Sequence, residues 1–135
     1  MQRLFTVLLV IAASGLVIVA AEKPSAEYQA AMKELGTFAA GIDAAVKAED
    51  YDAIVASANK AKEAFATTEA YWKGKDAKAA ALAHQGWQAA SDLIVMSGIK
   101  NVEGLTFAAS EARSTCMECH AAHRERLPDG TFEIK

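Results

Sequence analysis

The chain has 135 residues, of which 53% are hydrophobic and 23% are charged, and its formal net charge is −3. This length suits one small domain with a hydrophobic core, and the scattered basic residues do not form a typical nucleic-acid-binding surface. Only 7% of the residues are aromatic, and glycine and proline are sparse, at 8 and 2 residues. Such a composition favours an all-α protein over a β-sandwich or a barrel.

The N-terminal segment has the pattern of an export signal. A basic residue near the start precedes an apolar run over residues 4–21. Val19 and Ala21 occupy the small-residue positions of a signal cleavage site. The alternative is an uncleaved membrane anchor formed by residues 4–21, whose length is at the lower limit for a span. We therefore predict a signal peptide at residues 1–21, one domain at 22–135 and a periplasmic location.

Four segments with helical periodicity follow, joined by short connections. They are expected from Ser25 to about Lys47, from about Asp52 to Trp72, from about Asp76 to Ser97, and from near Asn101 to the break at Leu127-Pro128-Asp129-Gly130. In the first segment, apolar residues recur at intervals of three and four positions and form a seam along one side: Tyr28, Met32, Leu35, Ala39, Ile42 and Val46. Long helices with short connections predict an antiparallel, up-down-up-down four-helix bundle. For the polar tail 129–135, an extended strap and a frayed end both stay open.

The only two cysteines lie in the motif Cys116-Met117-Glu118-Cys119-His120. On a helix, cysteines three positions apart project from one face, and each can bond a vinyl group on a porphyrin. The next residue, His120, can then present an imidazole nitrogen to the iron. The motif therefore predicts one covalently attached haem c, bonded to Cys116 and Cys119 and ligated by His120.

Three other uses of the cysteine pair are less compatible with the sequence. A zinc site would need Cys116, Cys119, His120 and His123 to surround one ion from a single helical stretch, which is poor geometry. A thioredoxin-like redox pair would start a helix after a strand, and no strand pattern precedes the motif. A disulfide across so short a loop inside a helix is strained. Haem attachment agrees better with an exported helical protein.

Two parts of the chain resemble the cytochrome c′ family, the c-type cytochromes built as four-helix bundles. The stretch Cys116-Met117-Glu118-Cys119-His120-Ala121-Ala122-His123-Arg124 is similar to the family's haem motif. Met32-Lys33-Glu34-Leu35-Gly36 and Asp50-Tyr51-Asp52 are similar to its first helix and first turn. The chain departs from the family at His123, where Phe or Tyr is usual, and in a longer tail beyond Arg126.

The resemblance is greatest to low-spin members of the family, and it implies the second axial ligand. In those members the iron is ligated by a first-helix methionine that is followed directly by Lys and, four residues on, by Gly. Met32 matches this pattern, with Lys33 and Gly36. A thioether favours ferrous iron and raises the potential, although Met32 as a core filler remains open. His84 is the fallback ligand. Arg124 is expected to pair with a haem propionate or to lie solvated at the helix end.

The expected function is single-electron transfer by a six-coordinate His/Met haem, without enzymatic activity. Without the signal, 13 Lys and Arg residues stand against 17 Asp and Glu residues, so the expected partner is a redox protein with a basic patch. Neither nucleic-acid binding nor, after signal cleavage, stable membrane insertion is expected. The resemblance implies a possible homodimer through the first two helices. The alternatives are a five-coordinate haem protein that binds nitric oxide or carbon monoxide, and a metal-binding or helical interaction protein without haem.

Overall fold

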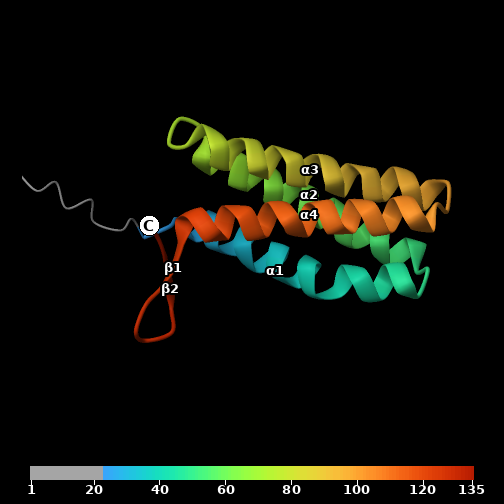
Figure 1. Cartoon of the computed structure of the whole chain (residues 1–135), viewed down its shortest axis with the longest axis horizontal. Helices are drawn as coiled ribbons and strands as arrows, with labels where there is room; N and C mark the ends of the chain where they lie inside the picture. Colours follow the sequence, from blue (N-terminus) through green and yellow to red (C-terminus); the bar gives the residue numbers. More distant parts are fainter. Residues whose placement is uncertain (1–22) are drawn as a thin grey trace, which may run out of the picture.

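The computed structural model describes residues 23–135, so the predicted signal peptide lies outside the described residues. The four helices are α1 (Ala26–Lys47), α2 (Tyr51–Trp72), α3 (Ala77–Gly98) and α4 (Val102–His123). They lie side by side, and short turns reverse the direction at each connection (Figure 1). The predicted antiparallel four-helix bundle is confirmed.

The helix starts follow from local side-chain chemistry, because a polar side chain caps each one. The Ser25 hydroxyl accepts from the Tyr28 amide at 3.2 Å, and Asp50 and Asn101 accept from amides three residues on, at 3.1 and 2.9 Å. Asp76 accepts from two amides of the first turn of α3, at 2.8 and 2.9 Å. These bonds satisfy N–H groups that have no partner within the helix. The observed helix starts therefore fall within one residue of the predicted ones.

The buried stripe of α1 differs from the predicted seam. Phe38 is 1% exposed and belongs to the stripe, which also contains Ala31, Leu35 and Ile42. The predicted seam residues Met32 and Ala39 are only partly buried. The difference accompanies the packing of α1, which contacts α2 more extensively than α4.

A close contact between α2 and α3 depends on Gly86. A Cβ atom on this residue would lie 2.3 Å from Cε1 of the buried Phe65 ring. Only a residue without a Cβ atom therefore leaves space for this ring. Phe65 also lines a cavity between α1 and α4.

The C-terminal tail forms a β-hairpin, which the helical periodicity did not predict. Strand β1 (Arg124–Arg126) pairs antiparallel with β2 (Phe132–Ile134). In the turn, Asp129 accepts from the amide and the hydroxyl of Thr131, at 2.9 and 2.6 Å, and Gly130 has φ +85°. The tail is therefore an ordered element attached to the end of α4.

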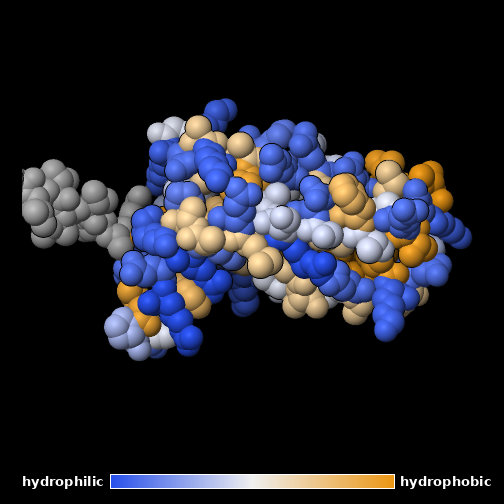
Figure 2. Space-filling view, viewed as in Figure 1, coloured by the Kyte–Doolittle hydropathy of each residue, from blue (hydrophilic) through white to orange (hydrophobic). Residues whose placement is uncertain are grey.

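The outer surface is largely hydrophilic, and hydrophobic groups gather where α3 passes into α4 (Figure 2). The exposed apolar residues of this corner include Val95, Ile99, Val102 and Phe107. Within residues 23–135, no helix combines the length and the apolar character that a membrane span requires.

Candidate functional site

A cavity of about 380 Å³ lies between α1 and α4, near the end of the bundle that carries the hairpin. Its floor is apolar and includes Leu35, Phe65 and Leu82. An ion pair between Arg113 of α4 and Asp43 of α1 joins the two helices one turn away from the cavity. The bundle is therefore held together beside an open space of the size found in small-molecule and cofactor sites.

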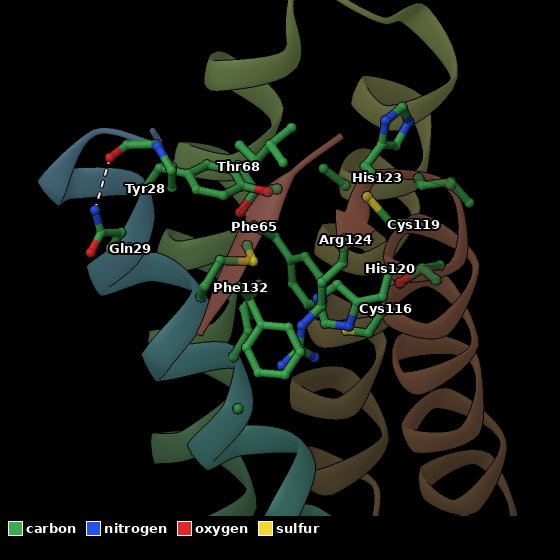
Figure 3. Close-up of a pocket in the computed structure, with 18 of the residues that line it drawn as sticks. Tyr28, Gln29, Phe65, Thr68, Cys116, Cys119, His120, His123, Arg124 and Phe132 are labelled. Carbon is green, nitrogen blue, oxygen red and sulfur yellow. Dashed lines mark hydrogen bonds between the residues drawn. The ribbon is translucent and has the colours of Figure 1, made fainter. Parts of the chain in front are cut away.

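The cysteine motif supplies the α4 wall of this cavity. Cys116, Cys119 and His120 all line it, whereas Met117 is 74% exposed on the outer face of the helix. Figure 3 shows the three lining side chains projecting from α4 toward the space, opposite Tyr28 on α1. The spacing of the motif on a helix thus places both thiols and the imidazole on one wall.

The electrostatics of this wall suit ligation by His120. Burial lowers the pKa of His120, and the positive charge of Arg124 lowers it further. Both effects favour the neutral imidazole, which has a lone pair to give to a metal. Both thiols are free and partly buried, and burial raises the pKa of Cys116 and of Cys119, which favours their protonated form.

The α1 wall carries Met32, Gly36 and Ala39. Met32 is partly buried and packs against both hydrophobic clusters of the bundle. A Cβ atom on Gly36 would meet no other atom within 4 Å. The same rotation of α1 that buries Phe38 thus turns the predicted ligand Met32 and two small residues toward the cavity.

The end of the cavity next to the hairpin is aromatic. Trp72 Nε1 donates to the Tyr28 hydroxyl at 3.2 Å, and burial raises the pKa of Tyr28 to about 12. The His123 ring packs on Trp72 with centroids 4.5 Å apart, and its Nε2 lies 3.5 Å from the Asp76 carboxylate. His123 thus has an aromatic packing role, at the position where an aromatic residue is usual in the resembled family.

Two other predicted site residues lie differently. His84 is exposed, with Nδ1 3.1 Å from a Glu69 oxygen and its ring stacked on Trp87, and it does not line the cavity. Arg124 does line the cavity, but its guanidinium lies 3.4 Å from the centre of the Phe132 ring. The structure therefore brings Met32 together with the motif and leaves the fallback ligand His84 apart.

The rival uses of the cysteines gain no support from the geometry. In the part of the chain that the structure describes, no group of three or more His, Cys, Asp or Glu residues is arranged to hold a metal ion. The thiols also lie in the last two turns of α4, far from the helix start where a thioredoxin-like pair would lie.

The residues present fit a haem. The donor set combines two thiols, one neutral imidazole and one thioether, which are the attachment and axial groups of a c-type haem. Apolar residues line the space between the two walls, and Gly36 and Ala39 project little into it. A flat apolar macrocycle matches this arrangement better than a hydrated ion does.

No family model, curated protein or solved structure matches this chain. Membership of the cytochrome c′ family therefore stays a prediction.

Sequence reasoning missed the hairpin as part of the site. Phe132, Glu133 and Ile134 line the cavity, although they follow the cysteine motif by more than ten residues. The alternation of Phe132 and Ile134 was the available signal, since two apolar residues spaced by two place both side chains on one face of a strand.

Proposed function

We propose that this protein is a c-type cytochrome that carries single electrons in the periplasm. One observation carries the proposal: a single cavity has Cys116, Cys119 and His120 on its α4 wall and Met32 on its α1 wall. In this proposal residues 1–21 export the chain and are then removed. The motif resemblance to the low-spin cytochromes c′ supports this proposal.

Each residue of the site has a defined task in this function. Cys116 and Cys119 would hold the haem covalently, and His120 and Met32 would hold its iron. A haem supplies the one-electron iron couple. One electron arrives from a reduced partner protein and one leaves to an oxidised partner, so the chain itself moves no proton and breaks no bond.

The site residues favour electron transfer because packing holds them in fixed positions. Met32 sits on a helix whose neighbouring side chains, Leu35 and Phe38, are buried, so its position is fixed by packing. His120 and Met32, held on packed helices, would keep their positions when a bound iron changed its charge. The excess of acidic over basic residues suits a redox partner with a basic docking surface.

The first test is the mass and visible spectrum of the protein produced with a haem-attaching system. We expect one porphyrin on the peptide that contains Cys116 and Cys119, and a low-spin spectrum. Met32→Ala should convert the spectrum to high spin, whereas Met117→Ala, which removes an exposed methionine outside the cavity, should not. A colourless protein would refute the proposal, and an unchanged Met32→Ala spectrum would refute the ligand assignment.

The open space beside Gly36 favours a second candidate, a five-coordinate haem that binds carbon monoxide or nitric oxide. A small ligand has room there if Met32 stays off the iron. Carbon monoxide added to the reduced wild-type protein separates the two functions. A rapid and complete spectral change would favour gas binding, and slow or partial binding would favour electron transfer.

A further inference from the structure

We propose that the C-terminal hairpin is a strap that covers the cofactor on the side of Cys119 and His120, with Phe132 and Ile134 as its contact residues. The proposal rests on the proposed function and adds a specific role for a segment that the sequence left open. It also explains why the tail extends beyond the end of the haem motif.

The hairpin has internal bonds that order it before any cofactor is present. Its strands pair from Arg124 with Ile134 to Arg126 with Phe132. The Leu127 amide donates to the Thr131 carbonyl at 2.8 Å, which closes the turn. A tail with these bonds keeps a defined shape and can present fixed side chains to a neighbouring surface.

The hairpin packs on the same small hydrophobic cluster as Cys119. Ile134 packs against the cluster of Tyr28, Trp72 and Ala79, and Cys119 packs against the same cluster. Cys116 instead packs against the main core of the bundle. Removal of Ile134 is therefore expected to uncover Cys119 and to leave the surroundings of Cys116 unchanged.

Phe132 stands on the other side of the motif. Its ring lies under the Arg124 guanidinium, and Arg124 is close enough to His120 for its charge to act on that imidazole. Figure 3 shows Phe132, Arg124 and His120 gathered beside the cavity. The ring is 48% exposed, so one face is in contact with the solvent while the residue lines the cavity.

The hairpin is attached lightly enough to move. Two backbone hydrogen bonds tie it to the end of α4: the Arg124 amide donates to the His120 carbonyl, and the Lys135 amide donates to the His123 carbonyl at 3.0 Å. The main core of the four helices includes no hairpin residue, and Ile134 packs against the smaller cluster of Tyr28, Trp72 and Ala79. The strap can therefore open to admit a porphyrin to the thiols and close again while the helices stay folded.

A closed strap has one consequence for a bound haem. Exclusion of water from its edge favours the less charged ferrous state and raises the reduction potential. This effect needs apolar side chains at positions 132 and 134.

The primary experiment uses the full chain produced without haem attachment. The double variant Phe132→Ser/Ile134→Ser is compared with wild type for the alkylation rates of Cys119 and Cys116 by iodoacetamide, measured by peptide mass at one pH. A matched control, Ile99→Ser/Val102→Ser, removes two exposed apolar residues at the opposite end of the bundle. Circular dichroism verifies the helix content of each variant.

We expect a several-fold faster alkylation of Cys119 in the hairpin variant, with Cys116 and the control variant at wild-type rates. An unchanged Cys119 rate would overturn the proposal. An equal rise at both cysteines would also overturn it, because general loosening of the bundle would then be the cause.

In the haem-loaded protein the same hairpin variant should show a lower reduction potential. If the potential does not change, the strap does not shield the cofactor. The outcomes remain distinguishable from failure of the proposed function, because absence of porphyrin from Cys116 and Cys119 refutes haem attachment, while the alkylation rates test the strap in either case.

Discussion

The cavity can be filled from α1 without disturbing the motif, by the substitution Gly36→Leu. Gly36 lines the cavity, and a Cβ atom there meets nothing within 4 Å. Gly41 lies on the same helix, is equally unobstructed, and does not line the cavity. Gly41→Leu is therefore a matched control with the same change in side chain and helix.

The two substitutions should act alike on the haem-free chain and differently on the loaded protein. Leucine in place of a mid-helix glycine stabilises the helix by about 0.8 kcal/mol in both variants. In the loaded protein, a leucine at position 36 competes with the cofactor for space, and overpacking of this kind costs about 1–3 kcal/mol. That cost corresponds to a roughly 5- to 150-fold shift in the folding equilibrium of the loaded protein toward the unfolded state.

The assay is the ratio of haem to protein, from the visible spectrum and intact mass, together with thermal unfolding of both haem-free variants. We expect both haem-free variants to melt above wild type, and only Gly36→Leu to acquire less haem during attachment or to lose the low-spin spectrum. If Gly36→Leu takes up haem as wild type does, the space between α1 and α4 is not the cofactor site.

Three further substitutions test packing and pH dependence. Gly86→Ala pushes against the Phe65 ring and should destabilise the bundle by about 1–3 kcal/mol in denaturant titration; an unchanged midpoint would contradict the close contact. Burial raises the pKa of Tyr28 from 10.0 to about 12. The contribution of the neutral Tyr28 to folding stability is therefore complete below pH 10 and is lost as pH rises toward 12. Tyr28→Phe should therefore flatten the wild-type decline over that window, and parallel curves would contradict this. Backbone hydrogen bonds lower the pKa of Asp76, so wild type should lose stability as pH falls through the carboxylate range, and Asp76→Asn, which still caps α3, should lose less.

The fold was largely predictable because its determinants are local. Ser25 and Asn101 were recognisable as caps, and Gly74 as a stop, from residue type and position alone, and Gly74 has the φ of +85° that such a stop requires. Apolar spacing then fixed the number and direction of the helices. The hairpin stayed undecided because its strands have three residues each, so the alternation of Phe132 and Ile134 is too short to distinguish an extended strap from a frayed end.

The candidate site was predictable where it depends on one helix and less so where it depends on several. Cys116, Cys119 and His120 share a wall because of their spacing on α4. The placement of Met32 depends instead on how α1 rotates against α2, and the predicted seam included Met32 and missed Phe38. Ala83, next to His84, lies on the apolar side of its segment, so the sequence allowed His84 to face inward. Only the packed structure shows that the His84 side chain points to Glu69 instead.

The size of the cavity bears on how the chain behaves before and after it receives a cofactor. Core cavities destabilise proteins by roughly 24 cal/mol per Å³, so a space of about 380 Å³ corresponds to at most about 9 kcal/mol. The cavity is partly open to solvent, which makes this figure an upper bound, yet it is comparable to the whole stability of a small domain, about 5–15 kcal/mol. A ligand that fills the space and is bonded to two cysteines should therefore raise the melting temperature by far more than any surface substitution. Differential scanning calorimetry of the haem-loaded and haem-free chains measures this difference, and equal melting temperatures would mean that the space between α1 and α4 is not where the cofactor binds.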